Sequence, residues 1–227
     1  MSPRLPVLIA ASFFILGMLA AQTQTTGSLY GKIDGSTYIT PGGTFKVQVP
    51  VLPEFGGEVH DTENSVTFDD AVSTHISIAN FPLDVSMKWE FETRGTRDFL
   101  SYFYANYVLA DFKARFPGAN TEGAQFLPGV RDGALLVALL LPGGSVFENK
   151  SNVLDGPITA PAVAKRGNLL FVRDGRIVIL SSELAERVTQ RSVYQKTPEQ
   201  ENEILRHRLI ELTSRMEFPT KPASKKP

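Results

Sequence analysis

The chain has 227 residues, of which 42% are hydrophobic and 21% are charged, and its formal net charge is −1. This composition is typical of a globular protein, and the near-neutral charge excludes strong electrostatic attraction to nucleic acid. The chain contains no cysteine, which excludes disulfides, zinc–thiolate sites, iron–sulfur clusters and thiol catalysis.

Residues 1–21 have the order of an export signal. One basic residue, Arg4, precedes a largely apolar stretch that ends at Ala21, and a polar stretch follows. This order predicts a signal peptide. Cleavage at the end of the stretch leaves a large residue, Met18 or Leu19, where a small one is preferred. An uncleaved N-terminal anchor therefore stays open, because an apolar run of about 17 residues is near the lower limit for spanning a bilayer.

The rest of the chain divides into a spacer, one domain and a tail. The spacer is rich in Thr, Gly and Ser, and the tail is rich in Pro and Lys and is expected to be disordered. Within the domain, alternating apolar residues and turn residues predict two strands and a hairpin first. The expected ranges are 22–38 for the spacer, 39–217 for the domain, 218–227 for the tail, 44–50 and 74–81 for the strands, and 57–70 for the hairpin.

Residues 84–93 alternate between apolar and polar side chains. This period of two predicts a further strand, with the sole tryptophan, Trp89, on its core face. The spacing then becomes helical over 96–116, with Thr96 as the N-cap and Pro117 after the end. The apolar face of this helix is rich in aromatic residues, so it either covers a sheet or offers a stacking surface to a ligand.

The second half predicts a buried strand, a long loop and a hairpin. Residues 133–142 are apolar throughout, which fits a strand covered on both faces. The polar stretch 144–161 is either a functional loop or a connection. Asp174 and Gly175 join two apolar runs and predict a hairpin turn. The basic residues nearby either bind an anion or are simply solvated, and we expect solvation; they are Lys165, Arg166, Arg173 and Arg176.

The last predicted element is a helix over residues 197–218. Thr197 is the expected N-cap, Pro198 occupies the first helical position, and Gln200 completes a capping box. The stripe expected to be buried consists of Leu205, Leu209, Leu212 and Met216.

No residue of the sequence can be assigned a catalytic, cofactor-binding or metal-binding role. Ser145 follows two glycines but has no assignable base, and His207 lies between arginines on the last helix. His60 and His75 have several carboxylates nearby, which is a weak indication of a metal site; we expect surface residues instead. Those carboxylates are Asp61, Glu63, Asp69 and Asp70.

The order of these elements resembles a known family. A "PGGTFKVQVP" first strand, the 96–116 helix, a buried strand, the "RGNLLFVRDGRIVILSS" hairpin and a C-terminal helix follow an export signal. This order is similar to the PsbP-like α/β sandwich, and the resemblance covers about residues 39–217. It implies an α+β fold with a central, mostly antiparallel sheet flanked by helices, an α/β/α-type sandwich. It also implies a non-enzymatic binding or accessory role.

The sequence thus predicts an exported, non-catalytic binding or accessory protein of the bacterial cell envelope, since exported eukaryotic chains more often contain disulfides. The expected location is periplasmic or extracellular. The expected partner is an envelope protein or a small ligand, with no nucleic acid, no cofactor, and membrane contact only through an uncleaved leader. The alternative is an exported hydrolase with a site assembled from scattered residues near the 144–161 loop.

Overall fold

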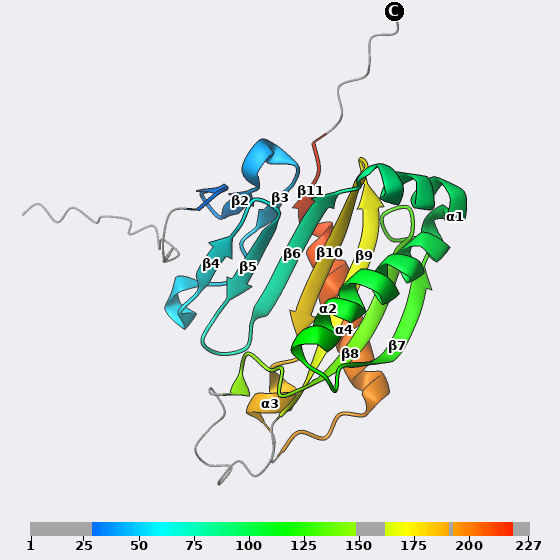
Figure 1. Ribbon diagram of the computed structural model, residues 1–227. Helices are drawn as coiled ribbons and strands as arrows, with labels where there is room; N and C mark the ends of the chain where they lie inside the picture. The colour runs from blue at the N-terminus through cyan, green and yellow to red at the C-terminus, as the bar shows by residue number, and fades with distance from the viewer. Residues whose placement is uncertain (1–28, 149–161, 191–192, 220–227) are drawn as a thin grey trace, which may run out of the picture.

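The computed structural model describes residues 29–148, 162–190 and 193–219 (Figure 1). These residues form an α+β fold with a seven-stranded antiparallel sheet, a smaller four-stranded sheet and helices on both faces of the larger one. The expected leader, 1–21, lies outside the described residues. None of the described helices is long and apolar enough to cross a membrane.

The seven-stranded sheet has the order β4-β5-β6-β10-β9-β8-β7, and every neighbouring pair is antiparallel. It contains the predicted hairpin, the strand after it, the buried strand and the second hairpin, so these four predictions are confirmed. The strands are β4 (Glu58–Asp61), β5 (Ser65–Asp69), β6 (His75–Pro82), β7 (Asn120–Leu127), β8 (Ala134–Pro142), β9 (Val163–Arg173) and β10 (Arg176–Glu183).

The turn between β9 and β10 consists of Asp174 and Gly175, as predicted. Their φ angles are 49° and 71°, the left-handed values that a two-residue hairpin turn requires. Arg176 is not simply solvated, because its guanidinium donates to the Asn80 side chain at 3.0 Å and to the Asn80 carbonyl at 2.6 Å. Arg173 lies near Asp132 and Asp174 in exposed ion pairs.

The four-stranded sheet joins the two ends of the described chain. It has the order β1-β2-β3-β11, with β1 (Lys32–Asp34), β2 (Thr37–Ile39), β3 (Lys46–Gln48) and β11 (Met216–Glu217). The spacer predicted over 22–38 is therefore wrong for residues 32–38. Tyr38 explains this in part, since its ring is buried and its hydroxyl donates to Asp61 at 2.7 Å. Burial and that hydrogen bond raise the pKa of Tyr38.

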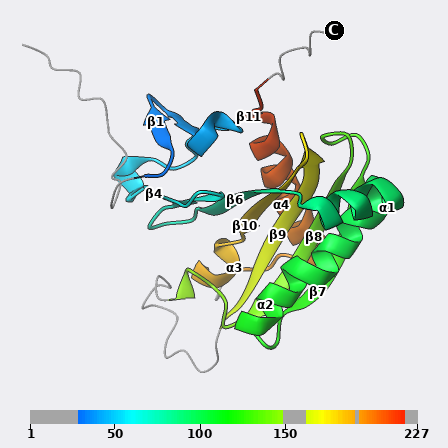
Figure 2. The same cartoon turned by 45° about the horizontal axis from the view of Figure 1, so that its top comes forward.

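One face of the large sheet carries α1 (Val85–Phe103), the π-helical turn η3 (Tyr104–Val108) and α2 (Leu109–Arg115) (Figure 2). Asp84 caps the start of α1 by accepting from the Met87 N–H at 2.8 Å. The strand predicted over 84–93 is therefore wrong, and Trp89 is 61% exposed instead of buried.

The alternating pattern of 84–93 has a helical explanation. Met87 and Phe91 are four residues apart and pack against the core, whereas Val85 and Trp89 are also four residues apart and are exposed. Gly95, at φ 75° and ψ 168°, then breaks the helix and turns the chain onto the sheet. The predicted 96–116 helix follows, and its aromatic face covers the sheet. Of the seven aromatic residues in this range, only Tyr107 is exposed, at 43%.

The other face carries α3 (Glu186–Thr189) and α4 (Pro198–Ser214). The predicted capping box of α4 is confirmed, with Thr197 accepting from the Gln200 N–H and Gln200 accepting from the Thr197 N–H. Leu205, Leu209 and Leu212 of the predicted stripe are buried on α4, whereas Met216 is buried in β11, beyond the end of the helix. Two short 3-10 turns, η1 (Pro41–Gly43) and η2 (Pro53–Phe55), flank β3.

Two hydrophobic layers result. One lies between the large sheet and α1, η3 and α2, and the other between the large sheet, the small sheet and α4. Phe218 belongs to the second layer, where its ring packs near Phe45 and Phe171. The predicted tail of 218–227 is therefore wrong at its first residue, and residues 220–227 lie outside the described ranges.

A charged side chain is buried between β9 and α4. Lys165 has no exposed surface, and its Nζ lies 3.0 Å from a Glu201 carboxylate oxygen and also pairs with Glu122. Arg187 pairs with the same Glu201 at 2.6 Å. The expectation that Lys165 is solvated is wrong, because this strand position faces α4 rather than the solvent.

Candidate functional site

The helices leave part of the large sheet open. α1 packs on β8 and β9, and α2 packs on β7, whereas no helix of the described residues lies over β4–β6 on that side (Figure 1). The solvent exposure of β5 and β6 agrees with this arrangement. Val66, Phe68 and Ile78, which face the small sheet, are buried, whereas the residues that point to the other face are partly or fully exposed. This surface lies on the same side of the sheet as α2.

The open surface carries a row of hydroxyl groups. Thr67 is the register partner of Ser77, and Ser77 is the register partner of Ser181. Register partners in antiparallel strands point to the same face. The hydroxyl of Ser181 is the third of the row, and it donates to the side-chain oxygen of the buried Asn168 at 2.5 Å. Three neighbouring strands thus place O–H groups side by side.

His75 lies beside this row, on the same strand as Ser77 and two residues before it. Its Nδ1 lies 2.5 Å from Oδ1 of Asp69, its register partner on β5, and its side chain is 12% exposed. It is therefore not the freely exposed residue that was expected. The contact with Asp69 fixes the ring and leaves Nε2 as the nitrogen free to meet a ligand.

A second ion pair lies on the same side of the hydroxyl row, on the two strands that follow β6 in the sheet. Arg166 and Glu183 are register partners on β9 and β10, and the Arg166 Nε lies 3.1 Å from the buried Glu183 carboxylate. Ser145 donates to the other Glu183 oxygen at 2.5 Å, and Arg166 also donates to the Gly144 carbonyl. These bonds hold the segment that follows β8 against the ends of β9 and β10.

The two ion pairs and the hydroxyl row border a hollow of about 460 Å³, which we call the polar hollow. Its walls include Phe112, Arg115 and Phe116 from the end of α2. All ionisable side chains that line it are bases, and their carboxylate partners lie outside the lining. The lining residues are Thr67, His75, Ser77, Phe112, Arg115, Phe116, Gly143, Gly144, Ser145, Val146, Arg166 and Ser181.

This lining determines what the polar hollow can bind. The hydroxyls of Thr67 and Ser77, the imidazole and the guanidinium groups can donate hydrogen bonds to a ligand, whereas Ser145 and Ser181 already donate to Glu183 and Asn168; two phenyl rings add apolar contact. The hollow therefore suits a ligand that presents acceptor oxygens on a partly apolar frame. The Ser145 hydroxyl donates to Glu183, whose carboxylate also pairs with Arg166, and it accepts from the Phe147 N–H at 3.0 Å.

The structure separates the two histidines that sequence analysis grouped together. His60 lies on β4 with an exposed contact to Glu58, whereas His75 lines the polar hollow. Asp61 accepts from the N–H groups of Tyr30 and Gly31. Among the described residues, no three His, Asp or Glu side chains gather as metal ligands do.

Other candidate residues lie away from the polar hollow. Glu63 is in the β4–β5 turn, and Asp70 caps the β5–β6 turn. His207 is exposed on α4. Of the 144–161 stretch, residues 144–148 border the hollow or lie next to it, and 149–161 fall outside the described ranges. Sequence reasoning missed the hydroxyl row, whose signal was polar residues at alternate positions of strands otherwise apolar.

No family model matches the chain, and no curated protein matches it either. Solved structures with a similar arrangement include the Ran-binding protein Mog1p of Saccharomyces cerevisiae, at 11% identity and a TM-score of 0.43, covering 84% of this chain and 96% of that one. The cyanobacterial PsbP (CyanoP) of Synechocystis sp. PCC 6803 is similar at 13% identity and a TM-score of 0.46, covering 86% and 99%. At these identities and TM-scores the likeness carries no conclusion about the function of this chain.

Proposed function

We propose that the chain is an exported, non-catalytic binding or accessory protein of the bacterial cell envelope. Its binding surface is the polar hollow, and its ligand or protein partner presents acceptor oxygens to it. The observation that carries this proposal is the open stretch of β5, β6 and β10, where hydroxyl groups and paired bases line one hollow. The apolar leader and the absence of cysteine support a periplasmic or extracellular location.

A binding role agrees with how the polar groups are held. Asp69 orients His75, and Glu183 holds both Arg166 and Ser145. Side chains fixed in this way lose little conformational entropy when a ligand arrives, so their hydrogen bonds contribute more fully to affinity.

The test uses two matched substitutions in the full chain with a C-terminal tag. Ser77→Trp fills the polar hollow, and Ser73→Trp places the same side chain on an exposed turn outside it. The tagged chain is recovered from the envelope of a bacterial host, its mass is measured, and co-purifying molecules are identified. We expect loss of the leader, and a bound molecule that Ser77→Trp removes and Ser73→Trp retains.

Two outcomes contradict the proposal. Recovery of the full-length mass from the cytoplasm would exclude export. A bound molecule that both variants retain would exclude the polar hollow as its site.

The alternative is a hydrolase with its site at the same place. The observation in its favour is that Ser145 and His75, far apart in the sequence, line the same hollow. A panel of ester, phosphate, glycoside and peptide substrates tests it. Turnover that both Ser145→Ala and His75→Ala abolish, with both variants folded, would favour the hydrolase over the binding protein.

A further inference from the structure

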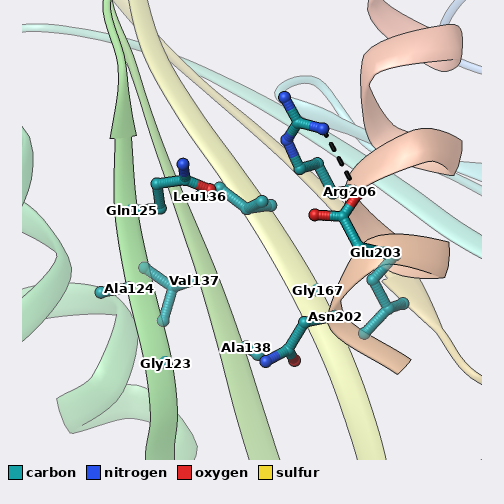
Figure 3. A pocket seen from close by; sticks show the side chains of 11 residues that line it. Gly123, Ala124, Gln125, Leu136, Val137, Ala138, Gly167, Asn202, Glu203 and Arg206 are labelled. Carbon is teal, nitrogen blue, oxygen red and sulfur yellow. Dashed lines mark hydrogen bonds and ion pairs between the residues drawn. The ribbon is translucent and has the colours of Figure 1, made fainter. Parts of the chain in front are cut away.

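A second hollow lies on the opposite face of the large sheet. α4 packs over β9 and β10, and beside it β7 and β8 remain partly uncovered (Figure 3). The hollow has a volume of about 200 Å³. We call it the α4 groove. Its apolar walls are Leu136 from the sheet and Leu205 from the helix.

Small residues make the floor of the α4 groove. Gly167 lets the helix approach, because a Cβ there would lie 2.9 Å from Leu209. Gly123 is different, since a Cβ there would meet nothing closer than the Asn202 amide nitrogen at 3.7 Å. A side chain at position 123 would therefore not obstruct the packing of α4, and the glycine leaves an empty space beside the helix.

Two buried polar atoms line this space. Oδ1 of Asn202 and Nε of Arg206 have no hydrogen-bond partner among the residues that the structure describes. Buried polar groups are normally paired, and an unpaired one is costly. One atom is an acceptor and the other is a donor, so the first can accept from a backbone N–H and the second can donate to a backbone C=O.

The α4 groove also borders the free edge of a strand. β7 ends the seven-stranded sheet, and within the described ranges no strand pairs with its outer side. Gly123 and Gln125 of β7 belong to the groove lining, and Figure 3 shows them facing α4 across it. An edge strand presents unpaired backbone N–H and C=O groups, which an extended peptide can pair with.

We infer that the α4 groove and the edge of β7 bind an extended peptide segment of a partner protein. One apolar side chain of that segment enters the groove against Leu136 and Leu205. Its amides pair with Asn202, Arg206 and the backbone of β7. This inference does not depend on the polar hollow, which lies on the other face of the sheet.

The test follows the full chain by ¹H–¹⁵N NMR during titration with N-acetyl-leucine methylamide, a single apolar side chain between two amides. A ligand of this size is expected to bind with a Kd of about 1 mM. The expected result is saturable shifts at the Gly123 and Gln125 amides, the Asn202 side-chain amide and the Arg206 Nε–H.

Two leucine substitutions in one hairpin make the control. Gly123→Leu fills the groove and should abolish the shifts. Gly129→Leu adds the same side chain in open space, where a Cβ meets no atom within 4 Å, and should leave the Kd unchanged. A probe methylated at the leucine nitrogen loses its amide donor, and should bind about tenfold more weakly because Asn202 stays unpaired.

Three results would each overturn the inference. They are an absence of saturable shifts at the groove, binding that Gly123→Leu leaves intact, and equal affinity of the two probes. None of them bears on the polar hollow, whose test uses Ser77.

Discussion

Some charged side chains of this protein are buried in its interior. Lys165 and Glu201 link the middle of β9 to the first turns of α4, and Arg187 and Glu122 complete the cluster from either side. Two cations and two carboxylates balance one another. Such a cluster stabilises the fold only as long as each buried charge keeps its partner.

We expect Lys165→Met to destabilise the fold by about 3 kcal/mol, because it leaves the buried Glu201 carboxylate with Arg187 alone. Lys165→Met combined with Glu201→Leu should cost less than the single change, because the buried charge is then removed. Urea denaturation of the three proteins measures both effects. A double variant less stable than the single one would show that the charges are not coupled.

Asp70 is a buried carboxylate of another kind, since its Oδ1 binds backbone N–H groups. Its Oδ1 accepts from the N–H groups of Val72, Ser73 and Thr74 at 2.7 to 2.9 Å. Burial alone acts to raise the pKa of Asp70, but the backbone and side-chain hydrogen bonds of the 72–74 turn outweigh burial and lower it.

A lowered pKa makes the contribution of Asp70 depend on pH. The carboxylate stabilises the fold above the unfolded-state pKa of about 3.9, and the contribution disappears as the pH falls through the lower folded-state value. Asp70→Ala should therefore cost about 2 kcal/mol at neutral pH and much less in strong acid. Urea denaturation across this range tests it, and a difference that does not change with pH contradicts it.

At the scale of elements, one glycine sets the course of α1. Gly95 has a backbone conformation open essentially to glycine alone, and a Cβ there would meet no atom within 4 Å. Strain is therefore the only cost of a larger residue at this position. Gly95→Ala should lower the stability by about 1–3 kcal/mol.

Thermal denaturation measures this cost. Gly129→Ala is the matched control, because its Cβ also lies in open space but its φ is not positive. The control should not lower the Tm. Equal effects of the two substitutions would mean that Gly95 carries no conformational constraint.

Elements with strong local signals were predictable from sequence. The Asp174–Gly175 turn and the Thr197 capping box depend on neighbouring residues alone, and both are present. The 84–93 segment was mistaken for a strand because Met87 and Phe91 alternate with polar residues while lying one helical turn apart. Apolar residues at every second position of so short a segment also include pairs four residues apart, which is the spacing of one helical turn. Only Asp84, which can cap a helix at its start, favoured the helix over the strand.

At the scale of the whole molecule, the two candidate sites exist because helices cover only part of each face of the seven-stranded sheet. Helices cover one half of each sheet face, and the polar hollow and the α4 groove lie where coverage ends. The sequence shows which side chains of a strand share a face, but not where a distant helix stops. The hydroxyl row joins residues 67, 77 and 181, whose proximity depends on strand order. Neither hollow was therefore predictable.

The last described residues contact parts of the fold that are distant in the sequence. Met216 is buried, Phe218 packs on Phe45, and Arg131 donates to the carbonyls of Thr213 and Met216. A chain that stops at residue 215 should be less stable than one that stops at 219 by about 3 kcal/mol or more. Denaturation of the two truncated chains checks this, and equal stability would contradict it.

The pairing of β11 with β3 also constrains the order of events during synthesis. Val47 pairs with Tyr38 on one side, but its partner on the other side, Met216, is synthesised after all the other described strands. The nascent chain therefore cannot complete the four-stranded sheet before β11 has been made. A protein proposed to cross a membrane after its leader gains from this delay, because the translocation machinery meets a chain that is not yet closed.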